Sequence, residues 1–125
     1  MLTVSITPSG ENNVVDIKER DTQTSTCTTD SSPAAWIQWY IGGHNVTNQA
    51  TAPPPLPDGF IFISHGILSY TGRDVDHNKV IFCEAVNIEG RQKIKSTEMS
   101  LNILCKFTLL LILWLSIMIK LFLLQ

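Results

Sequence analysis

The sequence predicts an all-β sandwich followed by one apolar helix, and three observations point to this architecture. Short runs rich in Val, Ile, Thr and aromatic residues recur at the roughly 8–12-residue spacing typical of a sandwich. Clusters of Gly, Pro, Ser and Asp separate these runs and mark the turns. The 125-residue chain then ends in an apolar stretch over residues 107–124, where Lys120 is the only charged side chain. We therefore expect one β domain over residues 1–104 and a separate helix over residues 105–125.

The predicted strands follow this pattern in order along the chain. Between the fourth and fifth strands lies a proline-rich segment, residues 50–59, with the sequence ATAPPPLPDG. Because proline cannot donate to a strand ladder, we expect this segment to be a sheet edge or an extended crossover. The predicted strand ranges are Leu2–Thr7, Val14–Ile17, Thr22–Thr28, Ile37–Ile41, Phe60–Ser64, Ile67–Thr71, Lys79–Val86 and Lys93–Leu104.

Two of these strands, residues 37–41 and 79–86, alternate with the period of two that is typical of a half-buried strand. One face of each strand carries apolar or sulfur-containing side chains throughout. We expect these two faces to form the core, with Ile37, Trp39 and Ile41 from the first strand and Ile81, Cys83 and Ala85 from the second.

The opposite, outward face of these two strands also carries apolar side chains: Tyr40, Val80, Phe82 and Val86. Exposed apolar patches on small domains commonly mark interfaces. We therefore hypothesise that these four residues contact a protein partner. The alternative is that the proline-rich segment or a neighbouring domain covers them.

The sequence contains three cysteines, Cys27, Cys83 and Cys105. A zinc site is not expected, because no Cys-x-x-Cys pair is present and no histidine lies near a cysteine at zinc-ligand spacing. A catalytic thiol would need a base and an orienting group, and no histidine lies in a recognisable signature of that kind. From the residues alone, an inert buried thiol and a disulfide both remain open.

A set of residues around two of the cysteines resembles the immunoglobulin-like (Ig-like) domains of cell-surface adhesion and recognition receptors. The resemblance extends over residues 1–104. The run RDVDHNKVIFCEAVN is similar in particular to the corner and following strand of nectin- and nephrin-type domains. The residues that carry the resemblance are Cys27, Ile37, Gln38, Trp39, Tyr40, Leu68, Asp76 and the run Cys83–Gly90.

The resemblance implies an antiparallel β-sandwich in which a Cys27–Cys83 disulfide joins the two sheets and Trp39 packs against it in the core. Closing so long a loop would stabilise the domain by ~4 kcal/mol through the reduced entropy of the unfolded chain. The sequence departs from the family pattern at Ile81, where such domains commonly carry a tyrosine.

The same resemblance implies a recognition or adhesion module that binds a cell-surface protein, either a second copy or a different chain. An enzyme is not expected, because the sequence has no phosphate-binding loop, paired-carboxylate site or nucleophile elbow. Nucleic-acid binding is not expected, since the 9 basic residues are balanced by 11 acidic ones and no basic face is indicated. No metal or cofactor is expected either. Arg91, Lys93 and Lys95 are interpreted as a solvated strand edge. A structural spacer that binds no ligand is the alternative function.

Residues 45–47 read Asn-Val-Thr, which is an acceptor sequence for N-glycosylation. The triplet follows the strand that holds Trp39, in a polar turn from which a glycan could project. We therefore predict a glycan at Asn45.

The apolar stretch over residues 107–124 predicts a single transmembrane helix with the domain outside the cell, at the plasma membrane. Eighteen residues give roughly 27 Å of helix, close to the ~30 Å hydrocarbon thickness of a bilayer. Lys120 can extend towards the headgroups, and Cys105 and Lys106 would lie at the membrane boundary. A cleaved signal for a glycolipid anchor is the alternative.

The disulfide and the membrane segment together imply export from the cell, since disulfides do not persist in the reducing cytosol. The sequence MLTVSITPSG at the N-terminus shows no secretory signal. We therefore expect either that the natural chain begins further upstream or that this sequence is one membrane-proximal piece of a larger receptor.

Overall fold

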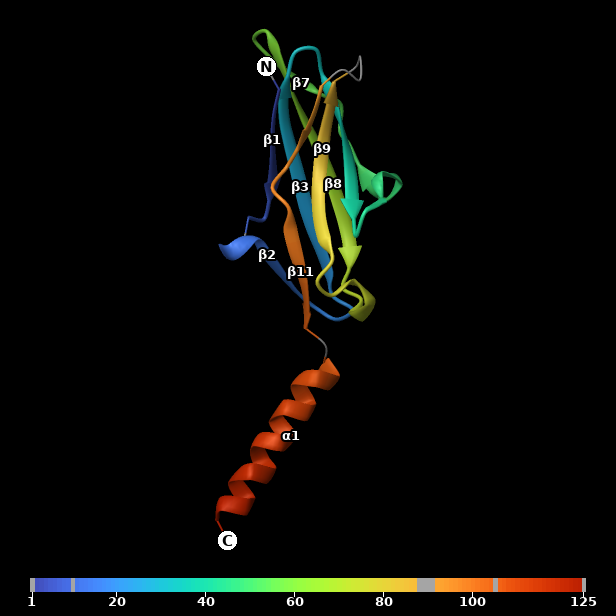
Figure 1. The fold of residues 1–125 in the computed structure, drawn as a ribbon. Coiled ribbons are helices and arrows are strands. Elements are labelled where there is room, and N and C mark those ends of the chain that lie inside the picture. Colours follow the sequence, from blue (N-terminus) through green and yellow to red (C-terminus); the bar gives the residue numbers. More distant parts are fainter. Residues whose placement is uncertain (1, 10, 88–91, 105, 125) are drawn as a thin grey trace.

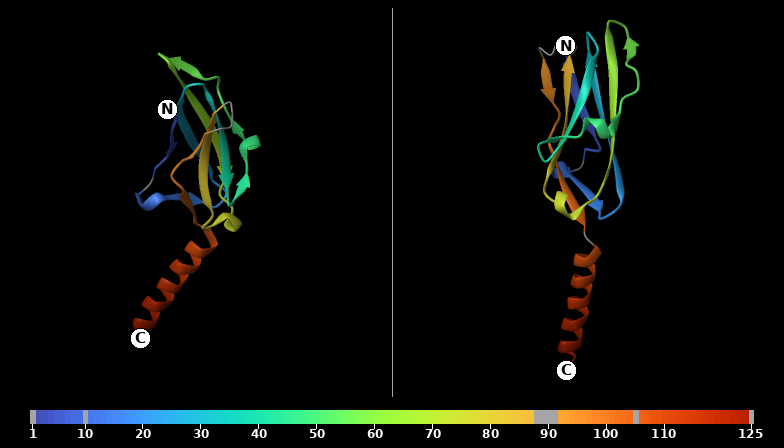
Figure 2. Two further views of the ribbon diagram at one scale, coloured as in Figure 1. Left: turned by 45° about the horizontal axis from the view of Figure 1, so that its top comes forward. Right: turned by 90° about the vertical axis from the view of Figure 1, so that its right-hand side faces the viewer.

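The computed structural model describes residues 2–9, 11–87, 92–104 and 106–124. Two sheets pack face to face, and helix α1 follows the last strand and leads away from one end of the sandwich (Figures 1 and 2). The hairpin formed by β7 and β8 lies at the opposite end (Figure 1).

The first sheet consists of five strands in antiparallel pairs. Strand β3 pairs with β1 on one side and with β8 on the other. The two short strands β6 and β7 both pair with β8, at different places along it. The bounds are β1 Leu2–Thr7, β3 Thr22–Ser31, β6 Ala50–Thr51, β7 Leu56–Asp58 and β8 Ile61–Thr71.

The second sheet has six strands, in the order β2-β11-β9-β4-β5, with β10 also pairing β9. The β2–β11 pair is parallel and the other pairs are antiparallel. In the described parts of the chain, 3₁₀ segments at residues 11–13, 47–49 and 74–76 connect strands. The bounds are β2 Val14–Lys18, β4 Ala35–Ile41, β5 His44–Asn45, β9 Val80–Asn87, β10 Lys93–Lys95 and β11 Met99–Leu104.

The predicted strands are confirmed, with two differences: two of the predicted strands are one continuous strand, and one predicted strand is divided in two. The predicted strands 60–64 and 67–71 form one continuous strand, β8. A Cβ added at Gly66, in the middle of β8, would lie 2.9 Å from Ile37 Cγ2 and 3.1 Å from Trp39 Nε1. The glycine therefore lets the facing sheet approach closely without interrupting the strand. The predicted strand 93–104 is instead two strands, β10 and β11, separated by residues 96–98.

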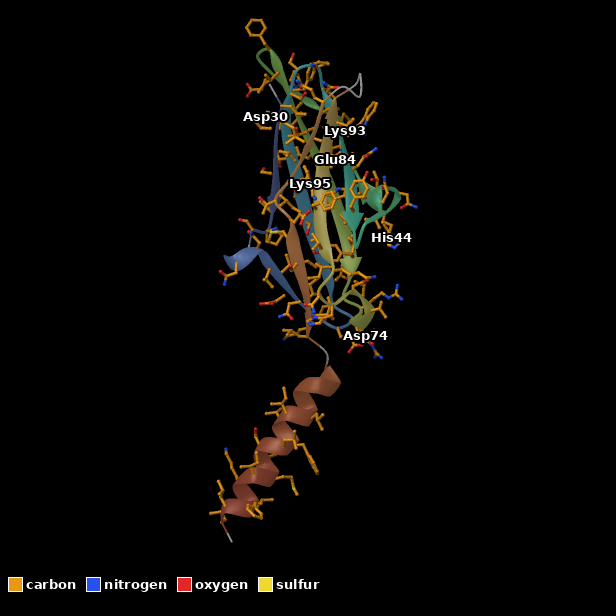
Figure 3. The ribbon with its side chains drawn as sticks, viewed as in Figure 1. Asp30, His44, Asp74, Glu84, Lys93 and Lys95 are labelled. Atoms are coloured by element: carbon orange, nitrogen blue, oxygen red, sulfur yellow. A yellow bond between two sulfur atoms is a disulfide. The ribbon has the colours of Figure 1, made fainter. Side chains whose placement is uncertain are left out.

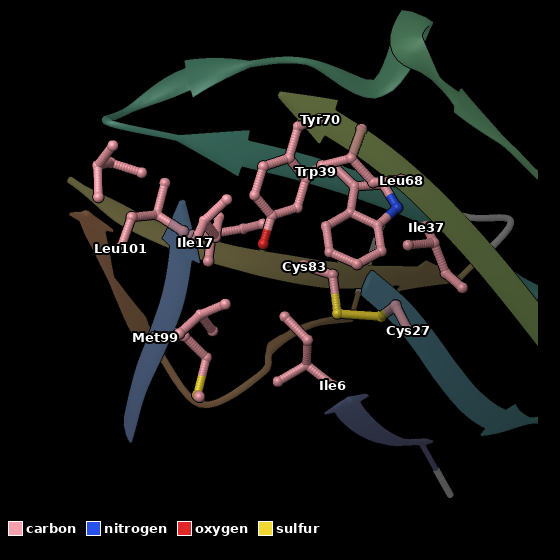
Figure 4. Close-up of a cluster of buried hydrophobic side chains, with 13 residues drawn as sticks. Ile6, Ile17, Cys27, Ile37, Trp39, Leu68, Tyr70, Cys83, Met99 and Leu101 are labelled. Atoms are coloured by element: carbon pink, nitrogen blue, oxygen red, sulfur yellow. A yellow bond between two sulfur atoms is a disulfide. The ribbon is translucent and has the colours of Figure 1, made fainter. Parts of the chain in front are cut away.

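The core lies between the two sheets and is centred on the disulfide (Figure 4). Cys27 of β3 and Cys83 of β9 form the predicted bridge, with their Cα atoms 6.3 Å apart. The predicted core residue Trp39 has no exposed surface, and its indole lies beside the bridge in Figure 4. The bridge thus ties together two sheets that share no strand pairing.

Ile81, which departs from the family pattern, and Tyr70 of the other sheet both lie in the core. Ile81 itself is fully buried as an aliphatic core residue. Tyr70 of β8 enters the core from the other sheet, and its hydroxyl lies 3.2 Å from Ser25 Oγ of β3. Burial raises the pKa of Tyr70 above its ordinary value, and the hydrogen bond with Ser25 partly offsets this shift.

Helix α1 runs from Lys106 to Leu123. Within the described part of the chain, no helix is both long and apolar enough to cross a membrane, so the transmembrane span predicted over residues 107–124 is not supported. Cys105, predicted to lie at the membrane boundary, is outside the described residues.

Candidate functional site

The outward surface formed by β4, β9 and β10, called the β4–β9–β10 face below, carries the candidate site. The register brings Tyr40 opposite Phe82 and Gln38 opposite Glu84. Strand β10 extends the face on the other side of β9, with Lys95 opposite Glu84 and Lys93 opposite Val86. Glu84, Lys93 and Lys95 lie together on this side of the domain in Figure 3.

An aromatic pair occupies the centre of this face. The rings of Tyr40 and Phe82 are stacked, with their centroids 5.0 Å apart and their planes inclined by 16°. The Tyr40 hydroxyl donates a 3.0 Å hydrogen bond to Gln38 Oε1. Aromatic pairs of this kind contribute ~0.5–1.5 kcal/mol beyond the area they bury. The stack therefore presents a flat, rigid surface that needs little ordering before contact.

A cation lies over the same pair. Lys95 Nζ is 4.1 Å from the centroid of the Phe82 ring, and it also forms an ion pair with Glu98. Exposed cation–π contacts are worth ~0.5–1 kcal/mol. The arrangement places the Lys95 ammonium, paired with Glu98, over the aromatic platform.

The four predicted contact residues differ in how far they are exposed. Tyr40, Val80 and Phe82 are half-buried on the outward side of the second sheet. Val86 is only 4% exposed, so the expectation that it is available to a partner is wrong. Trp36 of β4 and Lys93 of β10 flank it directly across the sheet, and this lateral cover is not visible in the sequence of a single strand.

Three residues of this face were missed by sequence reasoning. Trp36 is 52% exposed and lies two residues before Gln38, on the same side of β4. The period of two would have found it if the strand had been started at Ala35 instead of Ile37. Lys93 and Lys95 were interpreted as a solvated strand edge, because the position of Lys95 over Phe82 depends on how β10 pairs with β9.

The predicted glycosylation triplet lies at the end of β5, beyond the edge of β4. Asn45 is exposed, and its Oδ1 accepts a 3.0 Å hydrogen bond from the backbone N–H of Thr47. Thr47 Oγ1 in turn accepts a 2.9 Å hydrogen bond from the backbone N–H of Trp39. Thr47 thus has a structural role that is independent of any modification.

Comparisons with known proteins agree with this fold. The family described as CD80-like C2-set immunoglobulin domain matches residues 5–94. Among solved structures, the chain is similar to the fourth constant immunoglobulin domain of nurse shark IgNAR, with a TM-score of 0.59 and 16% identity. The match covers 80% of this chain and 93% of the shark chain, and at that identity it shows the fold alone. No curated protein matches the sequence.

The finer similarity to nectin- and nephrin-type domains is addressed by neither match and stays a prediction. The family match and the Cys27–Trp39–Cys83 core agree on the broader assignment. This chain belongs to the family of CD80-like C2-set immunoglobulin domains.

Proposed function

We propose that this chain is a non-enzymatic recognition module that binds a protein at a cell surface through the β4–β9–β10 face. The observation that carries the proposal is the stack of Tyr40 on Phe82 with Lys95 held over it. Aromatic residues are enriched at the energetic centres of protein interfaces, where they offer large contact area at low conformational cost. The Ig-like fold is consistent with this role, since such domains commonly mediate contacts between proteins.

The surroundings of the stack support the same use. Trp36 adds a half-exposed indole to the face, and Gln38, Glu84 and Lys93 surround it with polar groups. An apolar centre with a polar rim is the usual anatomy of a protein interface. Either a second copy of the chain or a different protein could provide the complementary surface.

We further propose that α1 holds the domain at a lipid bilayer, with the domain outside the cell. The described side chains of residues 111–124 are all exposed, and only Ser116 and Lys120 among them are polar. A helix that is apolar all round is stable only where other apolar groups surround it. The Cys27–Cys83 bridge favours an oxidising location, where a glycan at Asn45 could also be added.

The test uses beads that carry the full chain through an N-terminal tag, with Ile112→Lys and Leu115→Lys in α1 of every chain, wild-type and variant, so that the helix cannot attach the beads to lipid. Aggregation of the beads with one another would indicate binding to a second copy, and capture of the beads by intact cells would indicate a different cell-surface protein. Beads that carry Phe82→Asp should do neither. If wild-type beads neither aggregate nor bind to any of a broad panel of cells, the chain is better described as a spacer.

A further inference from the structure

The outer edge of β4 is only partly paired. Trp39 uses its backbone N–H and C=O on this edge, bonding Thr47 Oγ1 at 2.9 Å and the N–H of Val46 at 2.8 Å. Backbone groups alternate sides along a strand, so those of Ala35 and Ile37 point to the same edge. Strand β5 pairs only Tyr40 and Ile41. Within the described residues, the Ala35–Ile37 stretch of this edge therefore has no paired strand.

A cavity of about 270 Å³ lies against this open edge. Its walls include Trp36 and Ile37 from β4, Ser64 from β8 and the prolines of residues 53–55. The prolines have no N–H, so the segment that crosses here cannot pair with β4 as a strand would. The cavity and the open edge form one continuous feature at the side of the sandwich.

An unused polar group lines the cavity. Ser64 is only 4% exposed, and its hydroxyl has no hydrogen-bond partner among the described residues. Gly66, two residues further along β8, faces the indole nitrogen of Trp39, and that nitrogen also has no partner in the described part of the chain. Buried polar groups are nearly always hydrogen-bonded, so a ligand group that bonds to Ser64 would gain more than it does at an exposed hydroxyl.

The chemistry of the site selects for an uncharged, extended ligand. No aspartate, glutamate, lysine or arginine lies among the described lining residues. The main-chain groups to be satisfied, at Ala35 and Ile37, are two residues apart, which is the repeat of an extended strand. Addition of a strand to an exposed sheet edge is a known mode of peptide recognition, in which the main chain gives affinity and alternate side chains enter pockets.

We propose that an uncharged, extended peptide segment of a partner protein pairs with the Ala35–Ile37 edge of β4 and places one side chain in the cavity beside Ser64. This site uses the edge of the sheet and the space beside it, and it shares Trp36 with the β4–β9–β10 face. Its variants change Ser64 and Ser69, which are not part of that face, so their outcome does not depend on the Phe82 variants.

The first test measures hydrogen exchange of backbone amides by NMR on the full chain in detergent micelles. The amides of Ala35 and Ile37 should exchange faster than those of Trp36 and Gln38, which point to β9. If all four are equally protected, the edge is already covered and the proposal is wrong.

The second test adds the probe peptide acetyl-Thr-Val-Thr-Val-Thr-amide at millimolar concentration. We expect exchange at Ala35 and Ile37 to slow at least fivefold, with amide shifts that extend to Ser64. The control peptide acetyl-Thr-Pro-Thr-Pro-Thr-amide lacks two main-chain donors and should have no such effect. An equal response to both peptides, or a response to neither, would overturn the proposal.

A pair of variants then separates the cavity from the edge. Ser64→Val fills part of the cavity without changing β4, and it should weaken binding of the probe about tenfold. Ser69→Val, on the exposed side of the same strand, should leave binding unchanged. The amide spectra of Trp39 and Tyr40 report whether each variant remains folded. Equal affinity of the two folded variants for the probe would contradict the role of the cavity.

Discussion

The side chain of Ser96 supplies a hydrogen bond to Cys83 that a continuous neighbouring strand would supply. That strand is interrupted here, between β10 and β11. The Ser96 hydroxyl accepts a 3.0 Å hydrogen bond from the backbone N–H of Cys83 and donates one of 3.1 Å to the carbonyl oxygen of Thr97. The backbone N–H of Ser96 donates to the carbonyl oxygen of Cys83 at 2.8 Å. Both residues are buried. The backbone N–H and the carbonyl oxygen of Cys83 in β9 therefore both have hydrogen-bond partners where the neighbouring strand is interrupted.

Ser96→Ala should destabilise the domain by about 1–3 kcal/mol, because it leaves the buried N–H of Cys83 without an acceptor. Urea unfolding followed by tryptophan fluorescence measures the change. Ser69→Ala is the matched control, since its hydroxyl lies in an exposed contact with Thr24, and it should change stability by no more than about 0.5 kcal/mol. Equal losses in the two variants would contradict the role given to Ser96.

Tyr70→Phe should alter how stability depends on pH on the alkaline side. Because burial raises the pKa of Tyr70 in the folded state, its contribution is fully present below the unfolded pKa of about 10 and is lost as the pH rises through the folded pKa. At pH 8 the variant should be less stable by about 1 kcal/mol, since it loses the hydrogen bond with Ser25.

Unfolding curves at pH 8, 9, 10 and 11 test this sign. The difference between the wild-type and Tyr70→Phe proteins should shrink or reverse at the highest pH, because only the wild-type chain has this phenol to ionise on unfolding. A difference that stays constant over the whole range would show that burial of the hydroxyl does not oppose its ionisation.

Variants of the triplet at residues 45–47 distinguish the loss of a glycan from a loss of folding stability. When the chain is secreted from eukaryotic cells, a glycan at Asn45 should increase its mass. The Asn45→Gln variant should lose this increase, and the Thr47→Ser variant should retain it. Thr47→Ala should lose the increase and also about 1 kcal/mol of stability measured on enzymatically deglycosylated protein, because the N–H of Trp39 loses its acceptor. A wild-type chain without the increase would exclude modification at this site.

The association of α1 with lipid is tested by flotation of the purified chain with neutral phosphatidylcholine vesicles. The wild-type chain should float with the vesicles. The double variant Ile112→Lys, Leu115→Lys places two charges on the helix and should remain at the bottom of the gradient, because buried charges are costly in the hydrocarbon region. The double variant Lys93→Ala, Lys95→Ala, in the β domain, serves as the control and should float. If it fails to float, the basic strand and not the helix carries the association.

The core could be predicted from the sequence because it depends on local alternation. Trp39 and Cys83 lie on strands that are apolar on one face, and both are fully buried in the fold. The continuity of β8 was missed because His65 and Gly66 interrupt the run of strand-forming residues. Gly66 is needed there for the close approach of Ile37 and Trp39, which is a requirement of the opposite sheet.

The candidate β4–β9–β10 face could be predicted only in part, because some of its features depend on how distant strands pair. The stack of Tyr40 and Phe82 follows from alternation within two strands that pair. The position of Lys95 depends on the pairing of β10 with β9, and the burial of Val86 depends on its neighbours across the sheet. Relations between strands that are distant in the chain are set by tertiary packing, and no local pattern encodes them.

The most direct test of the proposed recognition function compares two variants with the same chemical change at different places. Phe82→Asp removes the centre of the β4–β9–β10 face, and Phe60→Asp changes a phenylalanine that is 96% exposed at the end of β7 and β8. Binding of the immobilised chain to the partner identified by bead aggregation or cell capture is measured by surface plasmon resonance. We predict that Phe82→Asp weakens this binding at least about 30-fold, or ~2 kcal/mol, while Phe60→Asp leaves it unchanged. Unaltered binding by a folded Phe82→Asp chain would contradict the account.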